Sequence, residues 1–304
     1  VGEKRELARH GRQRIRETGG MGATRIEWIG ESEFRVGTTD FVCCLPGTEI
    51  ESTPERFMIQ KARWAIEEYA LLLELLRPRT ILEVGLLRGG SVAMLSLLAK
   101  PEKLIGVELS PDRLPHLDEF VASHSLSDRV SLHYGVDQSD AVALGRICDA
   151  ELPGGIDLVI DDASHDLEPS RASFESLFPR LRPGGTYLLE DWSWAHAPFR
   201  IRRDRTALTV LVFELALACA RHPELIERVD INTDWALVRR GPGELPGDPA
   251  GFRLGDLIDE RGRALVPAID AGEPGTREAT ARAGSRRSTA QELRDRLRKL
   301  VRRR

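Results

Sequence analysis

Four carboxylic acids and a histidine follow two short apolar runs, and their spacing could build a metal-assisted reaction centre. The runs are IDLVID (156–161) and TYLLED (186–191), and the residues are Asp161, Asp162, His165, Glu190 and Asp191. If the runs form neighbouring strands about 4.8 Å apart, four carboxyl groups crowd one sheet edge. Carboxylates at that spacing repel one another, which raises their pKa values, and a bound divalent cation relieves the repulsion. The alternative is that helix N-termini and arginine side chains neutralise the acids.

The donor set favours a hard cation. It contains carboxylate oxygens, no cysteine and at most one histidine, which suits Mg²⁺ or Ca²⁺ better than zinc. Such a cation can orient a hydroxyl group and lower its pKa, and His165 could then accept the proton near neutral pH. A structural role for His165, as a helix-start histidine bonded to a backbone carbonyl, stays open.

A glycine-rich turn follows another apolar run, TILEV (80–84). The residues at the turn are Glu83, Gly85, Gly89, Gly90 and Ser91. Glycines there let the backbone approach a ligand, and the start of the next helix offers unpaired N–H groups to an anion. The spacing E-x-G-x-x-x-G is neither the dinucleotide fingerprint nor a P-loop. The turn therefore indicates a ligand site of another kind, or else a generic tight turn.

Acidic and amide side chains also end the next two apolar runs. Glu108 lies 25 residues after Glu83, and a carboxylate at that strand end can accept both hydroxyl groups of a ribose. Asp137 and Gln138 follow the third run, where they could bind an adenine amino group. Alternatively, this segment only caps a helix through Asp140, with solvated neighbours.

These residues need a sheet edge to hold them together, and the chain has the pattern for one. Short apolar runs alternate with helical segments, which predicts an α/β fold with a parallel sheet covered on both faces. The predicted strands are 80–84, 104–109, 130–134, 156–161 and 186–191, and the helices between them are 90–99, 112–124, 140–148 and 167–181. Right-handed crossovers place the C-terminal ends of all these strands on one edge, where open α/β sheets bind ligands.

Further elements are predicted on both sides of this core. A helix is expected over 54–76, where apolar residues recur at spacings of three and four. A second helix is expected over 206–221. Two closely spaced apolar runs follow, 227–231 and 236–240, and so short a connection predicts that they pair antiparallel.

The order of strands and motifs resembles that of class I S-adenosylmethionine-dependent methyltransferases. The motifs D-D-A-S-H and P-G-G-x-Y-x-x-E-D resemble those of metal-dependent sugar O-methyltransferases of macrolide tailoring, a group that includes proteins named cephalosporin hydroxylase. The likeness covers about residues 55–240. It implies a Rossmann-like, seven-stranded sheet of five parallel strands and an antiparallel terminal pair.

The resemblance also implies a role for each candidate residue. Mg²⁺ would be held by Asp162, Glu190 and Asp191, and His165 would be the general base. S-adenosylmethionine would be bound by Glu83, Gly85, Gly89, Ser91, Glu108, Asp137, Gln138 and Asp161. The acceptor would be a hydroxyl group of a sugar or polyol in a small molecule, as in natural-product tailoring. Ala163 stands where the family often has glycine.

Two questions stay open at this point. Trp192 and Trp194 follow the acids directly and could either wall an apolar acceptor pocket or pack into the core. The same fold could also serve as a catalytically inactive nucleoside-binding or interaction protein. A hydroxylase is not supported, because the sequence has no 2-His-1-carboxylate iron triad and no flavin motif.

Composition narrows the class of protein. With 304 residues, 41% hydrophobic and 30% charged, the chain has an ordinary globular composition. The net charge is −4, and residues 277–304 carry a surplus of positive charge, so the rest of the chain is acidic. An acidic body argues against nucleic acid as the main partner. The four cysteines lack zinc spacing, and no apolar run reaches the roughly 20 residues of a membrane helix. We expect a cytoplasmic homo-oligomer acting on a small molecule.

The chain is expected to divide into three parts. Residues 1–53, which mix short β-like runs with turns after a polar start, would form an N-terminal extension that serves as a lid or in oligomerisation. Residues 54–241 would be the methyltransferase domain. Residues 242–304 would be a linker rich in Gly, Pro and Ala, irregular to about residue 287, followed by a basic helical tail.

Overall fold

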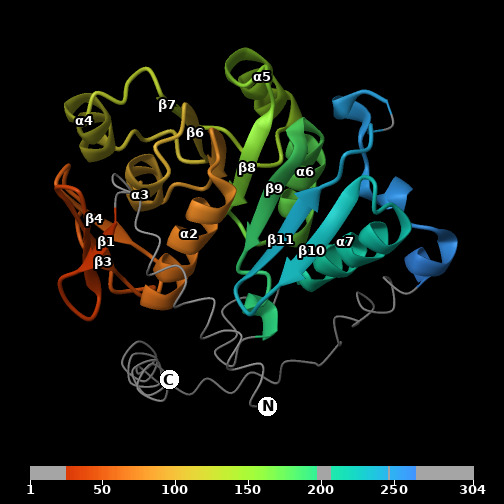
Figure 1. Ribbon diagram of the computed structural model, residues 1–304, viewed down its shortest axis with the longest axis horizontal. Helices are drawn as coiled ribbons and strands as arrows, with labels where there is room; N and C mark the ends of the chain where they lie inside the picture. The colour runs from red at the N-terminus through yellow and green to blue at the C-terminus, as the bar shows by residue number, and fades with distance from the viewer. Residues whose placement is uncertain (1–24, 197–206, 246, 265–304) are drawn as a thin grey trace, which may run out of the picture.

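The central element of the computed structural model is a mixed seven-stranded sheet (Figure 1). The structure describes residues 25–196, 207–245 and 247–264. The strands of this sheet are β5 (Thr80–Val84), β6 (Lys103–Glu108), β7 (Val130–Tyr134), β8 (Ile156–Asp161), β9 (Leu181–Glu190), β10 (Ile226–Ile231) and β11 (Trp235–Arg240). Their order across the sheet is β10-β11-β9-β8-β5-β6-β7.

Strand direction follows the predicted pattern. The strands β5 to β9 pair parallel to one another, β11 pairs antiparallel to β9, and β10 pairs antiparallel to β11. The prediction of a class I methyltransferase sheet, with five parallel strands and an antiparallel terminal pair, is confirmed. One difference is that β9 begins at Leu181, five residues before the predicted strand, and the β8–β9 register shifts between Ile156 and Leu158.

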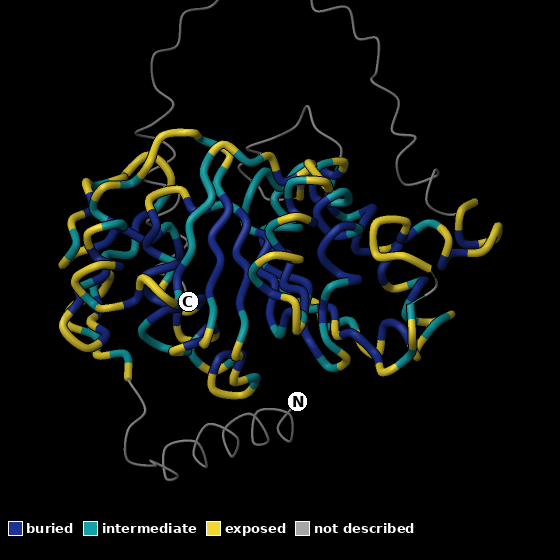
Figure 2. The backbone as a smooth tube through the Cα atoms, turned by 90° about the horizontal axis from the view of Figure 1, so that it is seen from above, coloured by how far each residue is buried: buried dark blue, intermediate teal, exposed yellow. Residues whose placement is uncertain are grey.

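Helices cover both faces of the sheet and bury a separate apolar cluster on each. They are α2 (Arg63–Leu76), α3 (Gly90–Leu98), α4 (Pro115–Ser123), α5 (Ala141–Glu151), α6 (Leu167–Leu177) and α7 (Thr209–Arg221). The cluster on one face includes side chains from α2, α3 and α4, and the other includes side chains from α5, α6 and α7. Figure 2 shows the buried strands between these more exposed outer layers. This burial on both faces explains why the strands are almost continuous runs of Val, Ile and Leu.

A second, four-stranded sheet packs beside α3 (Figure 1). Its strands, in spatial order, are β1 (Ile26–Trp28), β2 (Glu33–Val36), β3 (Thr39–Cys43) and β4 (Arg56–Ile59). The predicted helix over 54–76 is therefore wrong in its first part, because α2 begins only at Arg63. Parallel pairing of β4 with β3 buries Phe57, Met58 and Ile59, and this tertiary contact makes them a strand.

The segment after β11 is irregular, as predicted, but it is not a loose linker in its described part. It contains two short 3₁₀ turns, η3 (Pro249–Gly251) and η4 (Leu254–Leu257). Phe252, Leu254 and Ile258 are buried in the cluster that α6 and α7 form with the sheet. The predicted basic helical tail lies outside the described residues, as does the polar start of the chain. No described helix has the length and apolar character needed to cross a membrane.

Candidate active site

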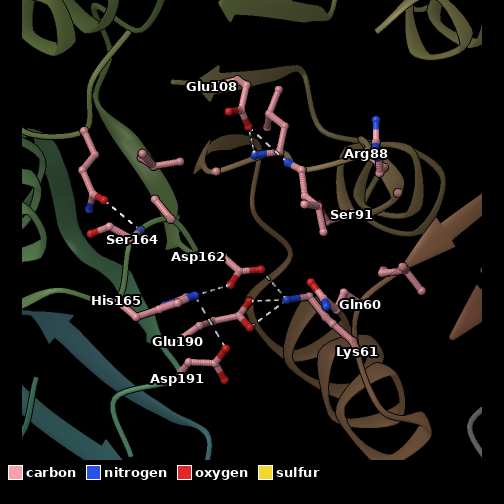
Figure 3. A pocket seen from close by; sticks show the side chains of 18 of the residues that line it. Gln60, Lys61, Arg88, Ser91, Glu108, Asp162, Ser164, His165, Glu190 and Asp191 are labelled. Atoms are coloured by element: carbon pink, nitrogen blue, oxygen red, sulfur yellow. Dashed lines mark hydrogen bonds and ion pairs between the residues drawn. The ribbon is translucent and has the colours of Figure 1, made fainter. Parts of the chain in front are cut away.

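A cavity of about 790 Å³ opens at the C-terminal edge of the parallel strands (Figure 3). Its lining comes from the ends of β5, β6, β8 and β9 and from the connection between β4 and α2. The topology therefore brings the predicted ligand residues of separate strands to one place, as a parallel sheet with right-handed crossovers requires. The N-terminal sheet contributes to the same cavity through Met58 and Ile59.

The glycine turn after β5 is packed so closely that side chains do not fit. Gly85 has a φ of 91°, and a Cβ there would lie 2.3 Å from the carbonyl oxygen of Asp162. Gly89 has a φ of 75° and is the N-cap of α3. A Cβ on Gly90 would lie 2.1 Å from the carbonyl oxygen of Met58, in β4. The turn is thus held between β8 on one side and the N-terminal sheet on the other.

Glu108, at the end of β6, holds this turn in place. Its carboxylate accepts hydrogen bonds from the backbone N–H groups of Leu86 (2.9 Å) and Leu87 (3.1 Å), and from that of Ser110 (2.9 Å). The side chain is partly exposed and lines the cavity. A carboxylate oxygen can accept more than one hydrogen bond, so this position leaves capacity for a ligand.

Glu83 lies beneath the cavity rather than in its lining. The side chain is fully buried, and burial raises its pKa to about 8. Within the described residues, neither carboxylate oxygen meets a donor at hydrogen-bonding geometry, although the Ser91 side chain is close enough to oppose the shift. A buried carboxyl group with so few hydrogen-bond donors around it is expected to be protonated at neutral pH. Ser91 itself lines the cavity.

The residues after β7 have different roles. Asp140 is the N-cap of α5, accepting hydrogen bonds from the N–H groups of Val142 and Ala143, as the capping interpretation predicted. Asp137 is exposed and bonds the backbone N–H and hydroxyl of Ser139, both at 2.7 Å. Gln138 is buried; its side-chain amide donates to Asp161, the last residue of β8, and accepts from the backbone N–H of Ser164 in the loop that follows. Asp137 and Gln138 both line the cavity.

Asp161 belongs to a hydrogen-bond network that is separate from the other acids. Its carboxylate accepts hydrogen bonds from the hydroxyl of Tyr187 (2.6 Å) and the side-chain amide of Gln138 (3.3 Å). Burial raises its pKa to about 6, against the effect of these donors. Asp161 does not line the cavity, and its contacts support the floor of the site.

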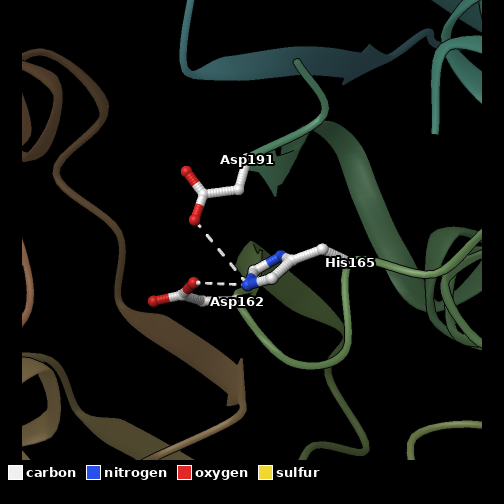
Figure 4. Close-up of side chains that lie close together, drawn as sticks. All are labelled: Asp162, His165 and Asp191. Atoms are coloured by element: carbon white, nitrogen blue, oxygen red, sulfur yellow. Dashed lines mark ion pairs between the residues drawn. The ribbon is translucent and has the colours of Figure 1, made fainter. Parts of the chain in front are cut away.

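Two acids and the histidine converge at one point (Figure 4). Ligand atoms of Asp162, His165 and Asp191 all lie within 4.8 Å of one another. The Nε2 atom of His165 is 3.7 Å from Oδ1 of Asp162 and 3.7 Å from Oδ2 of Asp191. His165 and Asp191 both have a left-handed backbone, with φ values of 55° and 54°, which costs about 1–3 kcal/mol for a residue other than glycine. The surrounding fold therefore stabilises both backbone conformations despite that cost.

The electrostatics of this cluster fit a divalent cation. Burial raises the pKa of Asp191 well above its ordinary value, and the charges of Asp162 and Glu190 raise it further. A hard cation bound by carboxylate oxygens relieves this repulsion. The carboxylates of Asp162 and Asp191 are compatible with Mg²⁺, and His165 lies beside them.

Glu190 has a different environment from the other two acids. Both its oxygens accept hydrogen bonds from Nζ of Lys61, at 2.7 Å each, and one also accepts from the hydroxyl of Tyr69. Nζ of Lys61 is also 2.8 Å from Oδ2 of Asp162. Sequence reasoning missed Lys61 and Tyr69, because a lysine and a tyrosine near the start of a helix have no distinguishing pattern.

The tryptophans after β9 take different positions. Trp194 lines the cavity, and its ring centroid is 4.7 Å from that of His165. Trp192 instead donates its indole N–H to the carbonyl of Asn232 (2.9 Å) and packs on the core. The cavity wall also includes Trp64 of α2 and Trp235 of β11. Their ring centroids are 6.3 Å apart, and no motif in the sequence distinguishes these two tryptophans.

A known family model matches the part of the chain that forms most of this cavity. Residues 82–192 match the family model described as a methyltransferase domain. Over these residues the chain is similar to a methyltransferase domain. The match agrees with the resemblance inferred from the sequence motifs, and all the residues predicted to bind cofactor or metal or to act in catalysis lie within the matched residues.

Curated relatives match the same region. Mycinamicin VI 2''-O-methyltransferase of Micromonospora griseorubida is 37% identical over 110 residues, which cover 36% of this chain and 24% of the relative. The 8-demethyl-8-alpha-L-rhamnosyl tetracenomycin-C 2'-O-methyltransferase of Streptomyces olivaceus is 32% identical over 152 residues, which cover 45% of this chain and 36% of the relative. The matches thus span well under half of each relative.

A solved structure with a similar backbone is MycE methyltransferase from the mycinamycin biosynthetic pathway, in complex with Mg and SAH. It is 28% identical, with a TM-score of 0.46, and the match covers 68% of this chain and 54% of that chain. An O-methyltransferase of Streptomyces achromogenes, TomG, is 19% identical with a TM-score of 0.44, over 60% of this chain and 81% of that chain.

Proposed function

We propose that the protein is a Mg²⁺-dependent O-methyltransferase that moves a methyl group from S-adenosylmethionine to a hydroxyl group of a sugar or polyol. The observation that carries this proposal is the convergence of Asp162, His165 and Asp191 at one end of a cavity whose other end is the glycine turn. The curated relatives that match the same region are named as O-methyltransferases of mycinamicin VI and of a rhamnosyl tetracenomycin. An acceptor from natural-product tailoring therefore fits best.

The donor would bind over the glycine turn. Glu108 would accept the ribose hydroxyl groups, since its side chain is partly exposed and lines the cavity. Asp137 and Gln138 would lie on the adenine side. Gly85 and Ser91, which line the cavity, would lie next to the donor, and Gly89 would support them as the N-cap of α3. Glu83 and Asp161 would support that floor from below, because neither lines the cavity.

The acceptor hydroxyl would react beside His165. Asp162 and Asp191, with Glu190 beside them, would hold Mg²⁺, which would supply positive charge that lowers the pKa of the hydroxyl. His165 accepts the hydroxyl proton at Nε2 as the oxygen takes the methyl carbon and the donor's carbon–sulfur bond breaks. The products are a methyl ether and S-adenosylhomocysteine. Alignment of oxygen, carbon and sulfur in the cavity supplies much of the remaining acceleration.

Aromatic side chains would bind the acceptor. Trp64, Trp194 and Trp235 line the cavity around the reaction point, and indole faces pack well on the C–H faces of a sugar ring. Trp64 is 38% exposed, so it is available to a ligand.

The test is methyl transfer from labelled S-adenosylmethionine to a panel of glycosylated and polyhydroxylated small molecules, with and without EDTA. We expect transfer that EDTA abolishes and added Mg²⁺ restores. Transfer that continues unchanged in EDTA contradicts the metal-dependent mechanism. Donor binding without transfer to any acceptor favours the alternative, a catalytically inactive nucleoside-binding protein of the same fold.

A further inference from the structure

The helix α2 has two apolar faces, and only one of them packs into the core. The residues of the packed face are Ala65, Ile66, Tyr69 and Leu73. On the opposite side Leu71 is 45% exposed and Leu75 is 81% exposed, the highest value for a large hydrophobic side chain among the described residues. Leu72 and Leu76 are next to them and partly buried. Together the four leucines form a continuous surface, the α2 leucine patch.

Acidic side chains flank the α2 leucine patch. Glu67, Glu68 and Glu74 are all exposed on the same helix. The sequence of α2 contains one basic residue, Arg63, at its start. Its guanidinium group pairs with Glu67 at 3.0 Å and lies over the ring of Trp28, 4.1 Å from the centroid. The patch is therefore apolar with an acidic border, and a partner with an apolar stripe and positive charge would complement it.

The sequence of this same chain contains a segment with the complementary pattern. Residues 288–304, which lie outside the described residues, are predicted from the sequence to form a basic amphipathic helix. Its apolar residues, Leu293, Leu297, Leu300 and Val301, recur at spacings that place them on one helical stripe. Seven basic residues stand against two acidic ones in this segment. Both the apolar stripe and the sign of the charge thus match the α2 leucine patch.

The connection between the two elements is long enough for them to meet. The described residues end at 264, and about 24 residues follow before the predicted helix. A flexible chain of this length has a typical span of about 27 Å and reaches about 80 Å at full extension. Such a tether gives an effective concentration near the millimolar range, so a weak contact is enough. The basic segment 1–24 fits less well, because residues 4–20 contain only two large aliphatic side chains.

We propose that the predicted helix 288–304 packs on the α2 leucine patch of its own chain, with its basic residues beside the flanking glutamates. Both partners repeat apolar residues four positions apart, which is the commonest pattern for packing two helices together. An amphipathic helix gains most of its stability from such packing. The patch begins about 10 Å along α2 from Trp64, so the contact leaves the cavity wall open. Docking needs neither metal nor donor and stands apart from the proposed function.

Hydroxyl-radical footprinting of the full chain tests the contact, because it labels side chains in proportion to their exposure. The variant Leu297→Asp/Leu300→Asp removes the apolar stripe of the predicted helix and changes no described residue. In the unchanged protein the helix would cover the α2 leucine patch. We therefore expect the labelling of Leu71 and Leu75 to rise at least about 3-fold in the variant, as the docked population is lost.

Two controls separate docking from a general change in the protein. Ser288→Asp/Gln291→Asp adds the same charges on the other side of the predicted helix, so the labelling of the α2 leucine patch should stay unchanged. Phe213, which is 50% exposed on α7, is the reference within each sample, and its labelling should be equal in all variants.

The acidic border is tested on the described side of the contact. Glu74→Lys places a positive charge beside the patch and would repel the basic segment. Because one exposed ion pair contributes little, docking should weaken only about 2- to 5-fold, seen as a smaller rise in the same labelling. The matched control is Glu119→Lys, at an exposed position on α4, which should have no effect.

Three results would overturn the proposal. The first is equal labelling of Leu71 and Leu75 in the unchanged protein and in Leu297→Asp/Leu300→Asp. The second is an equal rise in the control Ser288→Asp/Gln291→Asp, which would assign the effect to charge alone. The third is labelling that rises when the unchanged protein is diluted, because the patch would then contact a second copy of the chain. Contact within one chain predicts labelling that does not depend on protein concentration.

Discussion

The buried acid beneath the donor side of the cavity predicts an unusual dependence of stability on pH. Glu83 is fully buried, and its pKa is about 8 in the folded chain, against an ordinary value of 4.5. Because burial raises this pKa, the folded protein keeps the proton at pH values where the unfolded chain has lost it. The contribution of Glu83 to stability therefore falls as pH rises from the ordinary value toward the folded one.

The size of the effect follows from these two pKa values. Between about pH 5 and about pH 7.5, a shift of this kind removes about 3 kcal/mol of unfolding free energy. Glu83→Gln keeps the shape of the side chain but cannot ionise, so its unfolding free energy does not fall with pH for this reason. The pKa of about 8 already includes the opposing effect of the Ser91 side chain.

The assay is urea unfolding, followed by tryptophan fluorescence, of the unchanged protein and of Glu83→Gln across this pH range. Donor and divalent ions are left out, because both would bind the folded state and mask the effect. Other acids with raised pKa values, such as Asp161, are present in both proteins and cancel in the comparison. We expect the unfolding free energy of Glu83→Gln to increase relative to that of the unchanged protein as pH rises. Parallel pH profiles for the two proteins would refute the reasoning.

Three further predictions concern the reaction centre and its support. His165→Ala should keep donor affinity, measured by calorimetry, but lower turnover about 100-fold; unchanged turnover removes His165 from the mechanism. Asp191→Asn should weaken Mg²⁺ binding at least about 10-fold, and the exposed Asp149→Asn is the matched control; equal affinities contradict the assignment. Gly90→Ala would place a Cβ 2.1 Å from the Met58 carbonyl and should lower the unfolding free energy by about 1–3 kcal/mol. Gly154→Ala, which meets no atom within 4 Å, serves as its control in urea melts.

The central sheet was predictable because its signals are local. The strands β5, β7 and β8 coincide with the apolar runs read from the sequence, since parallel strands buried on both faces have little room for polar residues. The convergence of Asp162, His165 and Asp191 followed from strand order alone. Each of these residues comes after the C-terminal end of a neighbouring strand.

The N-terminal contribution was not predictable in the same way. The predicted helix included the residues of β4, although its apolar spacing begins only at Ala62, and pairing with β3 makes these residues a strand. That error hid Lys61, because its position depends on where β4 ends and α2 begins. Lys61 and Glu190 are 129 residues apart in the chain, and no local pattern in the sequence reports a contact between them.

The packing of the segment after β11 was missed for a related reason. Its Gly and Pro content indicates irregular backbone correctly, but composition does not say whether isolated apolar residues find a core. Phe252 and Leu254 do so, against the sheet face covered by α6 and α7. The sequence likewise does not distinguish the two tryptophans after β9. Trp192 bonds to the carbonyl of Asn232, whereas Trp194 lies against His165.

The most direct test of the account is crystallographic. Crystals grown with S-adenosylhomocysteine and saturating Mn²⁺, as a stand-in for Mg²⁺, would give an anomalous signal wherever the ion binds. The account predicts one peak at the C-terminal ends of β8 and β9, within bonding distance of Asp162 and Asp191 and next to His165. No peak at saturating Mn²⁺, or a peak elsewhere in the molecule, would contradict it.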